Sequence, residues 1–196
     1  MPSIDYDLRY LTSALPELES YLLSSDLYWP VGVTPPPGEP AYPSLTIGNA
    51  LLAWKRLESQ TLSPDNDREY RRLSQDLDGI RMHWRHAWEH KAAREFRARL
   101  NLWRDYLEDY RADPEGNIDR YAYEVHRRVE LELLSIETDA IHLQEAEMLQ
   151  GLDMLLEVLL EPGNFIWDPE LAGGFEKKTY WFLFGKPKVP KAPVQK

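Results

Sequence analysis

Five side chains of this sequence have the residue types and the spacing that a metal site needs. They are His83, His86, His90, Asp139 and His142. The first three lie three or four residues apart, so a helix places them on one face. Folding the chain back on itself near residue 115 brings the aspartate and the fourth histidine level with them, and zinc or iron accepts both ligand types. Helical phase puts all five on flanks rather than toward a shared core, so we expect the histidines to face water.

A metal-dependent or small-ligand-binding bundle using the face of His83, His86 and His90 is therefore the alternative hypothesis on function. Other catalytic patterns are missing from the 196 residues. There is no Gly-x-Ser-x-Gly turn, no Ser, His and Asp constellation and no phosphate-binding glycine loop. The absence of cysteine excludes disulfides, thiolate metal sites and cysteine nucleophiles. The sequence indicates no cofactor and leans against an enzyme.

Charge and composition narrow the range of partners. The net charge of −10 argues against a protein that coats nucleic acid, whose affinity comes from Lys and Arg at phosphates. In the range 64–111, ten acids interleave with eleven bases, so no clean basic stripe survives. No run of 18 apolar residues exists, and the first residues lack the features of a secretory signal. We expect a cytoplasmic protein without nucleic-acid or membrane partners.

The helical pattern predicts an all-α fold, an elongated bundle built on a long antiparallel helical hairpin. Its two arms are about 64–111 and 118–161, separated by the turn sequence "ADPEGN". Ser63 and Pro64 form a strong helix start, since serine caps and proline suits the first turn. Two shorter helices precede the hairpin, flanking a proline-rich connector at 30–43. Helices this long must extend or bend, and a shared bend at the level of Gly79 and Gly151 is the first expectation.

The hairpin register also predicts contacts between its arms. Glu130 and Glu132 come level with Arg97 and Arg99, and Glu137 with Arg94, as exposed pairs of small energy. A second apolar stripe on the 118–161 arm, which ends in Leu152, Leu156 and Leu159, indicates a second packing partner. The amino-terminal helices are expected to cover that stripe.

Nothing in the sequence is expected to cover the closed end of the hairpin, where apolar side chains spread over a wide arc. We therefore expect a homodimer or another protein partner there. The predicted interface residues are Phe96, Leu100, Trp103, Tyr106, Tyr110 and Trp181. A non-enzymatic protein–protein interaction or scaffold protein is the favoured function.

The chain divides into three expected parts. Residues 1–161 form the helical bundle, and residues 162–184 form an irregular aromatic arm that packs on the bundle or on a dimer mate. Residues 185–196 form a flexible basic tail, because lysine and proline alternate there. The run 180–184 is strand-like on both faces.

Overall fold

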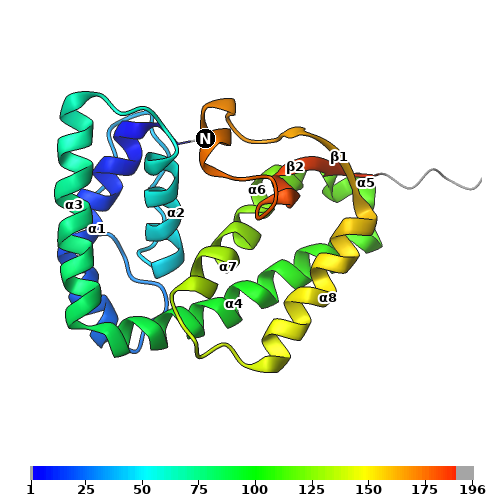
Figure 1. Ribbon diagram of the computed structural model, residues 1–196, viewed down its shortest axis with the longest axis horizontal. Helices are drawn as coiled ribbons and strands as arrows, with labels where there is room; N and C mark the ends of the chain where they lie inside the picture. The colour runs from blue at the N-terminus through cyan, green and yellow to red at the C-terminus, as the bar shows by residue number, and fades with distance from the viewer. Residues whose placement is uncertain (1, 189–196) are drawn as a thin grey trace, which may run out of the picture.

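The computed structural model describes residues 2–188 and has an all-α fold with one small two-stranded sheet (Figure 1). The fold class predicted from the sequence is confirmed. The helices are α1 (Ile4–Leu23), α2 (Ile47–Glu58), α3 (Pro64–His83), α4 (Arg85–Ala112), α5 (Pro114–Asn117), α6 (Tyr121–Glu124), α7 (His126–Ile136) and α8 (Leu143–Leu159). The strands are β1 (Leu160–Phe165) and β2 (Phe184–Pro187). No helix within residues 2–188 is both long enough and apolar enough to cross a bilayer.

Hydroxyl side chains begin the first three helices. Ser3, Thr46 and Ser63 each accept a hydrogen bond from the amide three residues ahead, at 3.1 to 3.2 Å. These bonds satisfy amides that have no partner within the helix. The proline-rich connector between α1 and α2 contains no helix, and a bridge between Trp29 and Leu45 ties its two ends together. The two predicted amino-terminal helices are therefore α1 and α2.

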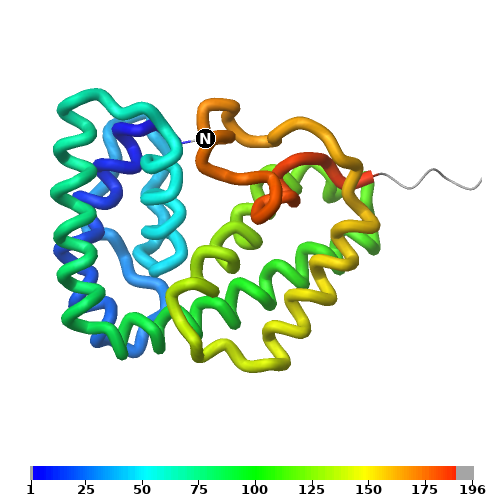
Figure 2. The backbone as a smooth tube through the Cα atoms, viewed as in Figure 1, coloured from blue at the N-terminus to red at the C-terminus, as the bar shows by residue number. Residues whose placement is uncertain are grey.

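The first predicted long helix is broken at Trp84, which is a correction to the sequence analysis. Figure 2 shows the backbone turning sharply between α3 and α4. Trp84 leaves helical geometry (φ −107°, ψ 30°), yet its amide still donates to Ile80 at 2.8 Å. Gly79, where a bend was expected, lies inside α3. The turn lets α3 pack on α1, while α4 packs on α7.

The second predicted long helix is broken twice. The chain passes through the short α6 before α7, and residues 137–142 then separate α7 from α8. Thr138 Oγ1 accepts from the amide of Ala140 at 3.0 Å, and this local bond competes with helix continuation. Gly151 lies within α8, so the expected shared bend at the two glycines is wrong.

The antiparallel pairing of α4 with α7 keeps part of the predicted hairpin. Arg99 and Glu130 are paired at 2.5 Å, as the register predicts, but both are buried rather than exposed. The other expected pairs do not form among the described residues. Arg97 pairs with Glu145 at the start of α8, and Arg94 donates to the carbonyl of Ser25.

The chain itself covers the closed end of the hairpin, contrary to expectation. Five of the six predicted interface residues are at most 2% exposed. They are Phe96, Leu100, Trp103, Tyr106 and Tyr110. The Tyr106 ring lies 6.5 Å from that of Tyr121, and the Tyr110 hydroxyl donates to the carbonyl of Lys188 beside β2. The prediction of an uncovered patch is therefore wrong, because it took the hairpin to be straight and the arm to lie elsewhere.

The carboxy-terminal segment closes over α6 and α7 (Figure 1). β1 and β2 pair antiparallel from Leu160 with Pro187 to Phe165 with Phe184. The Tyr121 hydroxyl donates to the carbonyl of Phe182 at 2.5 Å, and the indole of Trp167 donates to the carbonyl of Ala122 at 2.9 Å. The strand-like run 180–184 is mostly a 3-10 turn, and the strand follows it. Of the predicted basic tail, residues 189–196 lie outside the described part.

Candidate functional site

The five predicted metal-site residues do not assemble into a site. All five side chains are exposed, as the helical phase predicts for the histidines. His83 packs its ring edge against Trp84, with 4.9 Å between ring centroids. Among residues 2–188, no three or more His, Cys, Asp or Glu side chains gather in a way that could hold a metal ion. The described residues therefore offer no set of metal ligands for the alternative hypothesis of a metal-dependent bundle.

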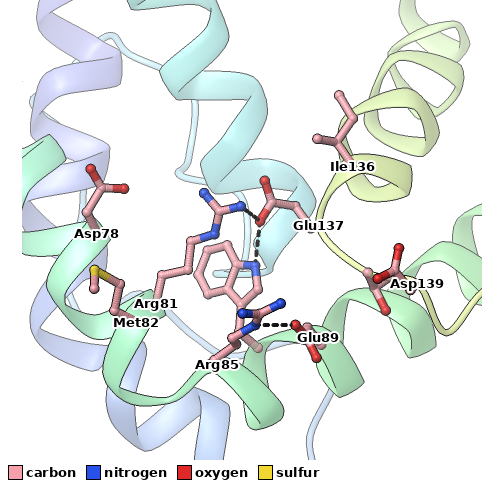
Figure 3. Close-up of a pocket in the computed structure, with 10 residues that line it drawn as sticks. Asp78, Arg81, Met82, Arg85, Glu89, Ile136, Glu137 and Asp139 are labelled. Atoms are coloured by element: carbon pink, nitrogen blue, oxygen red, sulfur yellow. Dashed lines mark hydrogen bonds and ion pairs between the residues drawn. The ribbon is translucent and has the colours of Figure 1, made fainter.

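A cleft lies where α3 ends and α4 begins (Figure 3). It has a volume of about 360 Å³ and lies between the end of α3, the start of α4 and the α7–α8 loop. Met82 and Ile136, which are 80% and 70% exposed, contribute apolar groups to the lining. The indole N–H of Trp88 donates to Glu137 at 2.8 Å.

Both arginines of this cleft are already paired, whereas Asp78 and Asp139 in its lining have no ion pair among the described residues. Arg81 pairs with Glu137 at 2.7 Å, and Arg85 pairs with Glu89 at 2.7 Å (Figure 3). An anionic ligand would have to displace one of these carboxylates, which opposes its binding. Glu137 of the α7–α8 loop thus contacts both Arg81 of α3 and Trp88 of α4, while the Arg85–Glu89 pair lies within α4.

A network of buried charges lies deeper, where α1, α2, α4 and α7 meet. Asp7 of α1 is fully buried and accepts two hydrogen bonds from Arg56 of α2, at 2.8 and 2.5 Å. Burial raises the pKa of Asp7, and the Arg56 guanidinium opposes that rise. A bidentate pair of this kind fixes the relative position of the two helices.

Arg99 is the centre of the second part of the network. Its guanidinium pairs with Glu95 of α4 at 2.8 Å and with Glu130 of α7 at 2.5 Å. It also donates to Thr46 Oγ1 at 3.1 Å, while the amide of Gly48 donates to Glu95 at 3.0 Å. The first turn of α2 is therefore bound to α4 through charged side chains.

Two neighbours on α7 have shifted proton affinities. Burial raises the pKa of Glu130 to about 7, although Arg99 opposes the rise. Burial lowers the pKa of His126 to about 4. The His126 Nδ1 faces the carbonyl of Tyr123, which can only accept, so Nδ1 carries the proton of the neutral ring. Glu130 is fully buried, whereas the His126 side chain is 22% exposed.

Three strongly exposed apolar side chains lie on α8. Leu143, Met154 and Val158 are 74%, 62% and 73% exposed. At 100° per residue they fall within about 60° of one another and roughly opposite the buried Leu156. We call these three residues, with Glu147 and Gly151 between them, the outer face of α8. Figure 1 places α8 along the edge of the molecule.

The outer face of α8 lies in an acidic part of the chain. Residues 129–176 contain twelve acids and no Lys or Arg. Within α8, Glu145 pairs with Arg97 and Asp153 pairs with Arg128. The carboxylates of Glu147 and Glu157 have no ion-pair partner among residues 2–188. The face is therefore apolar with an unbalanced negative charge.

The outer face of α8 is not among the surfaces predicted from the sequence. The leucines of α8 were predicted to form one stripe, covered by the amino-terminal helices. The break at 137–142 instead turns α8 away, so Leu156 is fully buried while Leu152 and Leu159 are half-buried. The available signal was Met154 and Val158, which lie outside that stripe. Trp181, the remaining predicted interface residue, is half-buried.

No protein-family model, curated protein or solved structure matches the chain in comparisons with known proteins. Neither a family nor a function is transferred from a relative, and the site itself carries the functional conclusion.

Proposed function

We propose that this chain is a helical protein–protein interaction module and that the outer face of α8 is its contact surface. The observation that carries the proposal is the exposure of Leu143, Met154 and Val158 on one side of one helix. Single exposed apolar side chains are ordinary on a protein surface, so the proposal rests on three of them sharing one side of α8, with Glu147 and Gly151 between Leu143 and Met154.

The helix itself adds support. α8 packs mainly on α4, and Leu156 is its only apolar side chain under 9% exposed. Gly151 lies in the middle of the helix with open space where a Cβ would be. A glycine there costs helix stability of about 1 kcal/mol relative to alanine. A partner helix that approaches closely at this position would offset that cost.

A homodimer was expected through the closed-end aromatic residues, and their burial removes that basis. The homodimer itself stays a prediction. A cytoplasmic location also stays a prediction.

Site-directed photocrosslinking tests the proposal. The full chain would carry p-benzoylphenylalanine in place of Met154 or Val158, and in place of Val33 as the control. Val33 is 55% exposed in the connector, away from α8. We expect discrete adducts from the two α8 positions in cells of the source organism, identified by mass spectrometry of the adduct. Adducts no stronger than those from the Val33 position would refute the proposal.

A further inference from the structure

We propose that the occupant of the outer face of α8 is a cationic amphipathic helix of another protein. It would have an apolar stripe flanked by Lys or Arg. This inference rests on the function proposed above and names the chemistry of the partner. Four features of the described residues lead to it: charge, extent, spacing and the open position at Gly151.

The charge of the surface selects a basic partner. Glu147 lies within the outer face, and Glu157 lies on its flank toward the groove between α7 and α8. Both are exposed and neither has an ion pair among the described residues. The cations closest to α8 in the structure, Arg97 and Arg128, are already bound to Glu145 and Asp153. A partner with Lys or Arg beside its apolar stripe would supply the missing positive charge.

The charge of the surface, and not its size, argues against a second copy. α8 has 17 residues, so it is about 25 Å long, and a strip about 10 Å wide covers on the order of 250 Å². That area is below the ~800 Å² per partner of a stable interface, so α8 alone supports a weak, transient contact with any partner. Two copies joined through α8 alone would place the same unpaired glutamates on both sides of a small contact. A cationic partner turns that repulsion into attraction.

The spacing of the apolar residues fits a helix better than an extended peptide. Met154 and Val158 are one turn apart, and Leu143 lies on the same side about 16 Å further along the axis, so the three follow the direction of the helix that a partner helix would contact. The Cβ that alanine would add at Gly151 meets no atom within 4 Å, so a side chain of the partner can approach the α8 backbone there.

The adjoining groove widens the contact on one side. It has a volume of about 400 Å³ and is lined by α8 residues together with Phe96, Ser135 and Ile141. Asp153 and Glu157 stand along its α8 side. A basic side chain of the partner that reaches over the flank of α8 would meet this acidic edge.

Fluorescence anisotropy with two synthetic peptides tests the inference on the full chain. One is an 18-residue peptide of leucine and lysine with leucines at helical spacing. The other has glutamate in place of every lysine. We expect the Leu/Lys peptide to bind at least tenfold more tightly than the Leu/Glu peptide, with binding that weakens as salt rises.

Two double variants of equal charge locate the binding. Met154→Lys with Val158→Lys should weaken binding of the Leu/Lys peptide at least tenfold. Leu23→Lys with Val33→Lys adds the same charge at exposed apolar sites elsewhere and should change binding less than twofold. Circular dichroism checks the fold, and Met154→Ser with Val158→Ser replaces the first variant if lysine unfolds α8.

The carboxylates have a matched pair of variants as well. Glu147→Gln with Glu157→Gln should weaken binding of the Leu/Lys peptide at least threefold. Glu19→Gln with Glu115→Gln should leave that binding unchanged. All four side chains are exposed, so the two variants lose equal charge from the surface.

Three results would overturn the inference. One is equal binding of the two peptides, and another is equal weakening by the α8 and control variants. The third is a light-scattering mass of a dimer that Met154→Lys with Val158→Lys converts to a monomer, because the occupant would then be a second copy. In that third case, or if α8 crosslinks to a protein while the Leu/Lys peptide does not bind, the proposed interaction function stands and only the partner is wrong.

Discussion

The buried pair of titrating residues on α7 gives a prediction with a definite sign. Glu130 has a pKa of about 7 in the folded chain against an ordinary value of 4.5. Between these values the folded state holds a proton that the unfolded state has released, so stability falls as the pH rises. The rise in pKa is about 2.5 pH units, and at ~1.4 kcal/mol per unit it amounts to about 3 kcal/mol.

His126 acts in the opposite direction. Its pKa is about 4 in the folded chain against an ordinary value of 6.5, and its side chain is 22% exposed. Between these values the unfolded state holds a proton that the folded state lacks, so stability falls as the pH falls. From 4.5 to 6.5 the two contributions have opposite slopes and nearly cancel in the native protein.

Single substitutions should separate the two contributions. We expect Glu130→Gln to gain about 3 kcal/mol relative to the native chain as the pH rises from 4.5 to 7, whatever constant offset the loss of the Arg99 pair adds. The free energy of unfolding of His126→Gln should rise relative to that of the native chain as the pH falls from 6.5 to 4. Urea unfolding followed by tryptophan fluorescence at closely spaced pH values measures both differences.

Glu147→Gln, at an exposed carboxylate on α8, is the control. The difference between its free energy of unfolding and that of the native chain should barely change with pH. A difference for Glu130→Gln that does not change with pH would refute the reasoning. It would mean that Arg99 keeps Glu130 ionised in the folded chain, and that burial does not decide its proton affinity.

Three further substitutions test the packing. Asp7→Asn should destabilise the chain by about 3 to 5 kcal/mol, because Arg56 would be left buried without a counter-charge; a loss under about 1 kcal/mol in urea unfolding would contradict the buried pair. Gly48→Ala should lower the thermal midpoint, since its Cβ would meet Glu95 Oε1 at 2.6 Å, and an unchanged midpoint would show that Glu95 can move aside. Trp103→Ala should cost about 3 to 5 kcal/mol while the light-scattering mass stays the same, because the indole is fully buried within one chain; a lower mass at unchanged stability would restore a subunit interface there.

Local signals in the sequence predicted the ends of elements well. Ser63 caps α3 and Pro64 begins it, and α4 ends at Ala112, within the predicted turn sequence. The break at Trp84 has no such signal, because neither glycine nor proline is present at that point. It arises from tertiary packing, which draws α3 toward α1 and α4 toward α7, and periodicity within one helix does not report on that competition.

The candidate site was less predictable than the fold. The predicted hairpin register put Arg99 near the level of Glu130, because residues equally far from the turn lie side by side. The register contains no information on α2, which covers this pair, so the contact was expected to be exposed. The outer face of α8 depends on the break at 137–142, and no pattern within α8 reveals which of its two apolar sides loses a partner.

The contact between α4 and the start of α2 has a consequence for how the molecule unfolds. Glu95 and Arg99 bind Gly48 and Thr46 with charged groups that are almost fully enclosed. If the amino-terminal helices separated from α4 first, Glu95 and Arg99 would be exposed to water and would lose their hydrogen bonds to Gly48 and Thr46. The two halves joined at Trp84 should therefore melt as one cooperative unit, with a calorimetric enthalpy equal to the van't Hoff enthalpy.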